Sequence, residues 1–196
     1  MKDRPILFSA PMIRAVLEGR KGQTRRTRGF DLFNISPNCQ LWQFLGFYDG
    51  VAAFRNQGER KEVKCPYGVP GDRLYVRESC AISRVGDDEG APLREPTVLY
   101  KADGYPVAGI DGYLKHPSIH MPRWASRILL EVTDVRVQRI QEISVNDCQS
   151  EGADFSLSGD YDFDLNREVP YHANFRRLWN AINEKRDLGW SVNPWV

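Results

Sequence analysis

The sequence predicts a single α+β domain, rich in β-strands, whose sheet curls into a barrel. The chain has 196 residues, close to one ordinary domain, and 41% of them are hydrophobic. Its 12 prolines and 16 glycines indicate frequent turns. Short strand-like segments outnumber the helical ones, and short antiparallel strands of this kind tend to close into barrels.

The first predicted helix spans residues 9–19. It opens with Ser9 and Pro11, which are typical of helix starts, and Gly19 suits the left-handed position after a helix end. The apolar residues expected to form its buried stripe are Ile13, Val16 and Leu17.

Two further helices are predicted near the end of the chain. In residues 144–151, Ser144 and Asp147 resemble a capping box, Ile143 and Cys148 can form a hydrophobic staple, and Gly152 ends the helix. The last helix is predicted from about residue 173 to 185, with apolar residues at the spacing of one helix face. These residues, expected in the core, are Phe175, Leu178, Trp179 and Ile182.

The rest of the chain reads as strands and long connections. The strand-like segments are residues 73–78, 97–101 and 127–140, the last with a kink near Thr133 and Asp134. The long stretches between them, which we expect to be inserted loops of the single domain 1–196, are about 29–66, 83–96 and 104–122. Within the first stretch, residues 41–47 and 51–54 have the composition of strands.

Charge is balanced overall and uneven locally. The net charge is +1, so nothing in the global balance indicates a duplex-binding protein. Residues 14–28 carry a basic excess of five charges and residues 151–168 an acidic excess of five. Runs of this kind usually form a solvated surface.

Several classes of protein are disfavoured by missing signals. The four cysteines are scattered without a C-x-x-C pair, and no signal peptide or membrane span is visible, which predicts reduced thiols, a cytoplasmic location and no membrane partner. His116 and His120 are separated by Pro117 and have no cysteine pair nearby, so no metal site is expected. Phosphate-loop, dinucleotide-binding and serine-hydrolase signatures are absent.

The first candidate site is the basic turn that carries Lys21, Thr24 and Arg26. If residues 23–28 are extended, Thr24 and Arg26 point to the same face, and Lys21 can reach back towards Thr24. An amine, a hydroxyl and a guanidinium would then converge on one cleft. The alternative is a solvated basic turn.

The second candidate is Glu78, which continues the strand face of Leu74 and Val76. An acidic side chain on an apolar face is costly to bury unless it is paired, and Lys21 or Arg26 would suit as its partner. The alternative is that the strand has ended and Glu78 is simply exposed.

The third candidate is the pair Arg123 and Trp124, in the loop before the strand at 127–140. A cation beside an aromatic ring suits a nucleobase with its phosphate or ribose. The alternative is ordinary packing of Trp124, with Arg127 in a surface ion pair.

These residues resemble a known family. Gly19, Lys21, Thr24 and Arg26 reproduce the G-x-K-x-x-T-x-R signature of ASCH domains, which are similar to PUA domains. The segment 71–78 looks like the second signature of that family, a turn and strand carrying an acidic residue. Nearly the whole chain further resembles ASCH-like proteins of bacteriophage and prophage genomes, through residues 8–12, 65–68, 120–127 and 193–196.

The resemblance implies a pseudo-barrel with flanking helices and a cleft lined by Lys21, Thr24 and Glu78. ASCH relatives include N4-acetylcytidine amidohydrolases, in which the matching lysine, threonine and glutamate act together. Other relatives are regarded as RNA-binding or RNA-cleaving proteins.

The sequence therefore predicts an amidohydrolase that removes an acyl group from N4-acylated cytidine or a related modified nucleobase. In one route Thr24 attacks the acyl carbonyl, with neutral Lys21 as base and Glu78 orienting Lys21 or protonating the departing amine. In the other, Glu78 activates water and charged Lys21 stabilises the oxyanion. Neither route needs a metal or organic cofactor.

The substrate, a modified cytidine nucleoside or RNA, would be bound by Arg26, Arg123 and Trp124. The leading alternative is an RNA-binding or RNA-cleaving module without amidohydrolase activity, and a further one is an accessory protein that binds another protein. The sequence predicts no oligomeric state.

Overall fold

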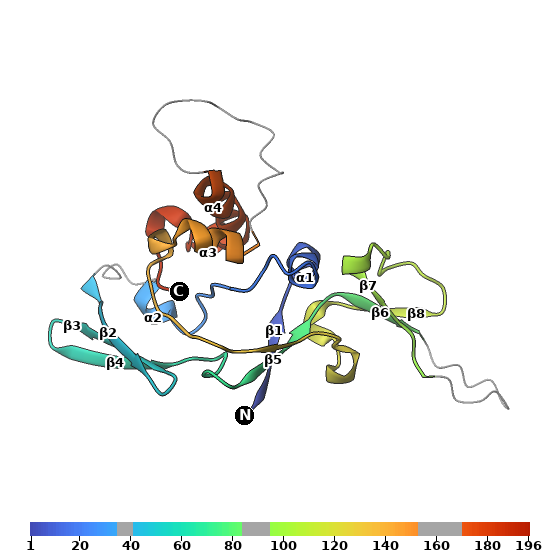
Figure 1. Ribbon diagram of the computed structural model, residues 1–196, viewed down its shortest axis with the longest axis horizontal. Coiled ribbons are helices and arrows are strands. Elements are labelled where there is room, and N and C mark those ends of the chain that lie inside the picture. The colour runs from blue at the N-terminus through green and yellow to red at the C-terminus, as the bar shows by residue number, and fades with distance from the viewer. Residues whose placement is uncertain (35–40, 84–94, 153–169) are drawn as a thin grey trace. The chain divides into compact units, whose positions relative to one another are not determined.

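The computed structural model describes residues 1–34, 41–83, 95–152 and 170–196. Its architecture is α+β, with three three-stranded sheets and a small number of helices (Figure 1). The chain divides into two compact units, each built from two stretches: the first unit is residues 1–18 and 70–133, the second is residues 19–69 and 134–196. That the two units act as one domain stays a prediction. Cys39, most of the insert at 83–96 and most of the acidic run 151–168 lie outside the described residues.

The first unit contains a sheet in which β5 (Arg73–Arg77) lies between β1 (Asp3–Leu7) and β9 (Leu129–Glu131). β5 runs parallel to β1 and antiparallel to β9. Leu74 and Val76 are buried, as their alternation predicts, and Glu78 follows directly with 2% of its surface exposed. The predicted strand at 73–78 is therefore confirmed, whereas the predicted strand at 127–140 is reduced to the three residues of β9.

The second sheet of the first unit has β6 (Cys80–Ser83) between β7 (Val98–Tyr100) and β8 (Tyr113–His116), both antiparallel to it. β7 confirms the strand predicted at 97–101. The stretch 104–122 is not irregular throughout, because it contains β8 and the 3-10 helix η3 (Ser118–His120). The core of this sheet is formed by Cys80, Ile82, Met121 and Ala125.

Helix α1 (Ala10–Leu17) begins after Ser9, which takes the N-cap position with an extended backbone but makes no side-chain cap hydrogen bond. Gly19 has a φ of +71°, the left-handed conformation expected of it. The predicted stripe is only partly right, since Ile13 is buried while Leu17 is 55% exposed. Leu17 lies in the last turn of this short helix, where periodicity alone does not say how much is covered.

The second unit contains an antiparallel meander of β2 (Gln43–Tyr48), β3 (Val51–Asn56) and β4 (Glu59–Lys64), which lie side by side in Figure 1. Both strand-like pieces of the stretch 29–66 are thus confirmed. β4 was not predicted, because five of its six residues are charged, a composition that suits an exposed edge strand. The meander packs on α2 (Asp31–Asn34) through an aromatic core that includes Phe30, Phe33, Trp42, Phe54 and Trp195.

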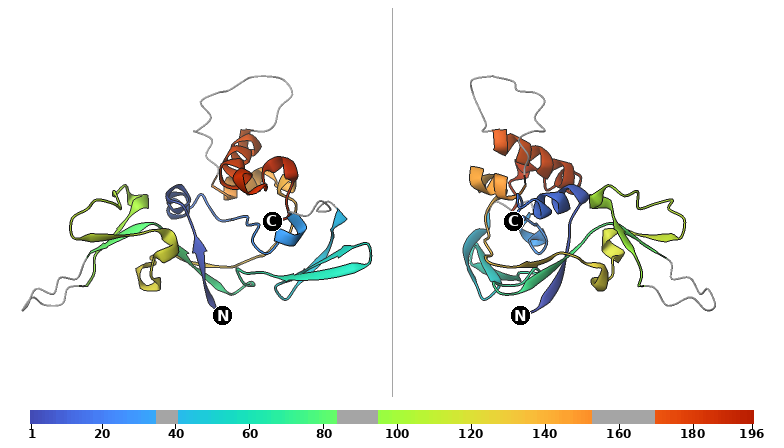
Figure 2. Two further views of the ribbon diagram at one scale, coloured as in Figure 1. Left: turned by 180° about the vertical axis from the view of Figure 1, so that it is seen from behind. Right: turned by 45° about the vertical axis from the view of Figure 1, so that its right-hand side comes forward.

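Helices α3 (Val145–Ser150) and α4 (Pro170–Asn183) lie against each other in the second unit (Figure 2). The predicted cap of α3 is confirmed, since the backbone N–H of Asp147 donates to Oγ of Ser144 at 3.1 Å. Phe175 and Trp179 of α4 are buried with Cys148, as predicted. The other two residues predicted for this stripe are not in the core: Leu178 is 37% exposed and Ile182 is 46% exposed.

The last residues of the chain pair with the segment that precedes α3. The backbone N–H of Ile140 donates to Pro194 O at 3.0 Å, and that of Val196 to Gln138 O at 3.0 Å. The amide of Asn34 makes two hydrogen bonds to the backbone of Trp195, at 2.7 and 3.0 Å. These contacts fix Trp195 in the aromatic core.

Across the described ranges, the strands form three separate sheets rather than one closed barrel. In the same ranges, the helices lack the length and hydropathy needed to cross a membrane.

Candidate functional site

The segment that carries Lys21 and Thr24 is fixed to the end of α3 by backbone contacts. Lys21 forms an isolated antiparallel bridge with Glu151, and the N–H groups of Gly22 and Gln23 both donate to Ser150 O, at 2.8 and 2.9 Å. After this bridge, residues 22–27 run irregularly, so the extended strand expected over 23–28 does not form. The bridge therefore fixes the backbone of Lys21 against Glu151 at the end of α3.

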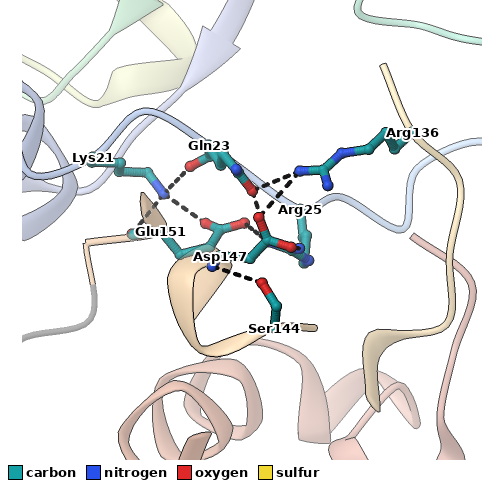
Figure 3. Close-up of polar contacts among 7 residues, drawn as sticks. All are labelled: Lys21, Gln23, Arg25, Arg136, Ser144, Asp147 and Glu151. Atoms are coloured by element: carbon teal, nitrogen blue, oxygen red, sulfur yellow. Dashed lines mark hydrogen bonds and ion pairs between the residues drawn. The ribbon is translucent and has the colours of Figure 1, made fainter. Parts of the chain in front are cut away.

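The ammonium group of Lys21 is buried and surrounded by oxygen atoms (Figure 3). Its Nζ donates to Oε2 of Glu151 at 2.7 Å, to the backbone oxygen of Glu151 at 2.9 Å and to that of Gln23 at 2.7 Å. The side chains of Lys21 and Glu151 are only 2% and 6% exposed. Because a neutral amine has two N–H groups and an ammonium three, three acceptors at these distances favour the charged form of Lys21.

A second carboxylate extends this arrangement. Arg25 donates to Oε1 of Glu151 at 3.1 Å and pairs with Oδ2 of Asp147 at 3.1 Å. Arg136 donates to Oδ1 of Asp147 at 3.2 Å and to Oε1 of Gln23 at 3.1 Å. We call the set drawn in Figure 3 the Lys21 cluster; its members are Lys21, Gln23, Arg25, Arg136, Ser144, Asp147 and Glu151.

Burial and charge pull the pKa values of this cluster in opposite directions. Burial lowers the pKa of Lys21 below its ordinary value, while the charge and hydrogen bond of Glu151 act against that lowering. Burial raises the pKa of Asp147, but hydrogen bonds from Gln23 and Arg136 and the charge of Arg25 outweigh it and bring the value to about 2. The surrounding hydrogen bonds and charges therefore keep Asp147 ionised at neutral pH.

Thr24 and Arg26 follow Lys21 on the irregular segment, and both are half-buried. Burial lowers the pKa of Arg26, against the opposing influence of Tyr67 and Glu151. The basic run 14–28 is therefore not simply a solvated face, because Lys21 and Arg25 are in buried ion pairs while Arg20 and Arg28 are exposed.

Glu78 lies in the first unit and is buried with a bidentate partner. Nε of Arg127 donates to Oε1 of Glu78 at 2.9 Å, and Nη2 donates to Oε2 at 3.2 Å. The same guanidinium donates to both carboxylate oxygens of Asp103 at 2.8 Å. The alternative of an exposed Glu78 is wrong, and its observed partner is Arg127, which only the alternative interpretation of the Trp124 loop places in an ion pair.

We call Glu78, Tyr100, Asp103 and Arg127 the Glu78 cluster. The guanidinium carbon of Arg127 stacks 3.9 Å from the centre of the Tyr100 ring. Burial lowers the pKa of Arg127, but its hydrogen bonds to Asp103 and Glu78 outweigh this and raise it. Burial, with a contribution from Glu78, also raises the pKa of the neighbouring Cys80 thiol to about 11. This cluster therefore has two carboxylates on one permanently charged cation.

Arg123 and Trp124 lie on the 3-10 helix η4 (Arg123–Ala125) of the first unit. Arg123 donates to Oδ2 of Asp3 at 3.1 Å and lies 4.7 Å from the centre of the Tyr75 ring. Trp124 is 57% exposed, so it is not packed in the core. The indole of Trp124 is therefore open to contact, and that Trp124 and Arg123 together bind a nucleobase stays a prediction.

The ion-pair partners of Lys21 and Glu78 have no signal in the sequence. There, Glu151 has the pattern of a helix end within an acidic run, and Arg25 that of a member of a basic run. Neither pattern gives information about an ion-pair partner far along the chain. Lys21 and Thr24 belong to the second unit and Glu78 to the first, and that these three side chains converge stays a prediction.

The described residues hold no group of three or more His, Cys, Asp or Glu side chains suited to a metal ion. His116 ends β8 and His120 ends η3. The cations and carboxylates that the structure does bring together instead form ion pairs, whose chemistry is proton transfer and the stabilisation of charge.

Comparison of the chain with models of known protein families, with curated protein sequences and with solved structures finds no match.

Proposed function

We propose that this protein is an ASCH-type hydrolase that removes an acyl group from the exocyclic amine of N4-acylated cytidine or a related modified nucleobase. Lys21, Thr24 and Glu78 are the proposed catalytic residues. The observation that carries the proposal is the buried ion pair of Lys21 and Glu151, located in the segment that bears the family-like signature.

A solvated basic turn is incompatible with that observation, since the Lys21 side chain is 2% exposed. Burying a lysine costs several kcal/mol by order of magnitude unless it is paired and hydrogen-bonded. Groups whose pKa is shifted by burial together with a specific charged partner are concentrated at functional sites, which supports a chemical role for Lys21.

The contacts favour the route in which Lys21 is charged. In that route Glu78 takes a proton from water, the resulting hydroxide attacks the acyl carbonyl, and Lys21 and Thr24 donate to the oxyanion that forms. The C–N bond then breaks, the departing amine takes the proton that Glu78 accepted from water, and the acyl group leaves as a carboxylic acid. For Nζ of Lys21 to reach the oxyanion, the substrate must replace one of its two backbone carbonyl acceptors.

The ion pair with Arg127 supports a role for Glu78 by geometry, because the two hydrogen bonds from the guanidinium fix the orientation of the carboxylate. Arg26, Arg123 and Trp124 are the proposed substrate-binding residues, with Trp124 stacking on the base. The fold included in this proposal is a PUA-like barrel.

The test is turnover of N4-acetylcytidine by the purified protein, followed by ultraviolet absorbance and by release of acetate. We expect turnover by the wild type and a loss of about 10²-fold or more in Thr24→Val, which removes the hydroxyl at nearly constant volume. Thr133→Val, at an exposed threonine, is the matched control and should retain wild-type turnover. Absence of turnover on every acylated cytosine offered would refute the proposal.

An RNA-binding module without hydrolysis is the second candidate, and the exposure of Trp124 beside Arg123 favours it. The affinity of a protein that binds phosphate groups falls steeply as the salt concentration rises, whereas the rate of nucleoside hydrolysis should change little. The discriminating measurement is RNA affinity against salt concentration for wild type, Trp124→Ala and Tyr48→Ala. Tyr48 is 71% exposed on β2 and controls for the loss of an exposed ring. A steep slope, with affinity lost only in Trp124→Ala and no turnover, would establish this second function instead.

A further inference from the structure

We infer that Glu151 is a positioning residue for Lys21, which fixes both the location and the positive charge of the Lys21 ammonium group. The catalytic consequence of this inference rests on the proposed function, whereas its effect on Lys21 is independent of any substrate.

Glu151 contacts Lys21 through two different groups. Its carboxylate oxygen Oε2 lies 2.7 Å from Nζ, and its backbone oxygen lies 2.9 Å from the same atom. The other carboxylate oxygen, Oε1, accepts from Arg25 at 3.1 Å. With both oxygens engaged and the side chain 6% exposed, the carboxylate cannot rotate freely, so the ammonium group is held at one position.

The position of Glu151 in the fold adds to this constraint. Glu151 is the C-cap of α3, and its backbone N–H donates to Asp147 O at 2.9 Å. Helix α3 is capped at its other end by Ser144, and its Cys148 is fully buried in the core of the second unit. Gly152, with a φ of +81°, lets the chain turn directly after Glu151. The carboxylate is therefore carried by a well-anchored element rather than by a mobile loop.

The charges that act on Lys21 make Glu151 decisive for its protonation. Glu151 raises the pKa of Lys21, while Arg25 and Arg26 lower it in addition to burial. Without the Glu151 charge, a desolvated ammonium would face two guanidinium groups. The neutral amine would then become the favoured form at a lower pH.

Asp147 provides a matched comparison within the same helix. It is a buried carboxylate one turn before Glu151, and its described side-chain contacts include Arg25 and Arg136. Removing its charge perturbs the same cluster without removing the carboxylate that contacts Lys21. A general structural role and a specific role towards Lys21 can thus be separated.

The experiment is a pH titration of the lysine side chains by heteronuclear NMR at Cε and Nζ in the full chain. Lys21 is one of seven lysines, and its signal is assigned by its loss in Lys21→Arg. We expect Glu151→Gln to lower the midpoint of the Lys21 titration by about 1 to 3 pH units, the effect of losing an opposite charge in contact. Asp147→Asn should lower it by clearly less.

A second variant keeps the test decisive. Glu151→Asp retains the charge but withdraws it by one methylene, so it should give a midpoint between those of the wild type and Glu151→Gln. If Glu151→Gln does not fold, as judged by circular dichroism, the shift in Glu151→Asp alone decides. A midpoint that does not move in the folded Glu151 variants, or that moves as far in Asp147→Asn, would overturn the inference.

The activity measurement separates this inference from the proposed function. If the wild type hydrolyses N4-acetylcytidine, Glu151→Gln should lower kcat more than it raises KM and should move the alkaline limb of the kcat profile to lower pH, with partial recovery in Glu151→Asp. If the wild type shows no turnover, the proposed function fails, while the titration still confirms or refutes the role of Glu151.

Discussion

In the second unit a buried lysine is surrounded by carboxylate and carbonyl oxygens, whereas in the first unit a buried glutamate is held by a guanidinium. The Lys21 cluster has three cations, Lys21, Arg25 and Arg136, and two carboxylates. The Glu78 cluster has two carboxylates, Glu78 and Asp103, and the single cation Arg127. The first arrangement leaves a positive excess and the second a negative one.

This difference shows how each side chain is held in place. Lys21 lies among acceptors that favour the ammonium form, whereas the Glu78 carboxylate accepts two hydrogen bonds from the guanidinium of Arg127. Each side chain has this partner inside its own unit. In the proposed hydrolysis, the ammonium group of Lys21 stabilises negative charge and Glu78 accepts a proton.

The largest expected effect on stability is in the Lys21 cluster. Glu151→Leu should cost about 3 to 5 kcal/mol of unfolding free energy, because it leaves Lys21 and Arg25 buried without this carboxylate. Lys21→Met should cost less, since Glu151 keeps its ion pair with Arg25. Urea denaturation of both variants measures the difference. An equal loss of unfolding free energy in the two variants would show that Glu151 does not stabilise both Lys21 and Arg25.

The corresponding change in the Glu78 cluster should be smaller. Arg127→Met leaves the Glu78 carboxylate without its bidentate partner, at a cost of about 2 to 3 kcal/mol. Water can compensate in part, because the Arg127 side chain is 26% exposed. Adding Glu78→Gln should recover part of the loss, as measured by the same denaturation experiment. Arg60→Met, which breaks the exposed pair with Glu62, is the control, and a loss there as large as in Arg127→Met would contradict the account.

Asp147 predicts an acid dependence specific to the Lys21 cluster. Its pKa is about 2 in the folded protein against an ordinary value of 3.8, so the folded state binds this proton less readily than the unfolded state. The resulting stabilisation, about 2 kcal/mol, is present above pH 4 and is lost as the pH falls through 3.8 towards 2. In Asp147→Asn the unfolding free energy should fall less between pH 4 and pH 2, because this stabilisation is already absent. Asp134→Asn, at an exposed carboxylate, should show the same fall as the wild type. Thermal unfolding at a series of pH values checks this.

Local elements of the fold could be predicted from the sequence because their signals are local. Ser144 caps α3 where the sequence predicts, and the alternation of Leu74 and Val76 identifies β5. The strand β4 could not be predicted in this way, because it is an edge strand whose charged side chains hide the alternation. Leu178 and Ile182 follow helical periodicity but remain partly exposed. Periodicity shows which side of a helix is apolar, but not how much of that side the rest of the protein covers.

The candidate site could be predicted in its members but not in its pairings. The signature pointed to Lys21, and the apolar alternation of β5 to a buried Glu78. The partner of Lys21 is 130 positions away, and that of Glu78 is 49 positions away. No periodic pattern relates residues at such separations, and nothing in the sequence indicated that Lys21 would pair with Glu151 or that Glu78 would form its ion pair with Arg127.

The measurement that tests the central claim most directly is the turnover of N4-acetylcytidine by Lys21→Met, Glu78→Gln and the double variant, each shown to be folded. If the two clusters serve one reaction, turnover should fall by about 10²-fold or more in each single variant. The double variant should then be only slightly slower than the less active of the two single variants. Losses that multiply to about 10⁴-fold, or turnover that survives either substitution, would contradict the claim that Lys21 and Glu78 act together.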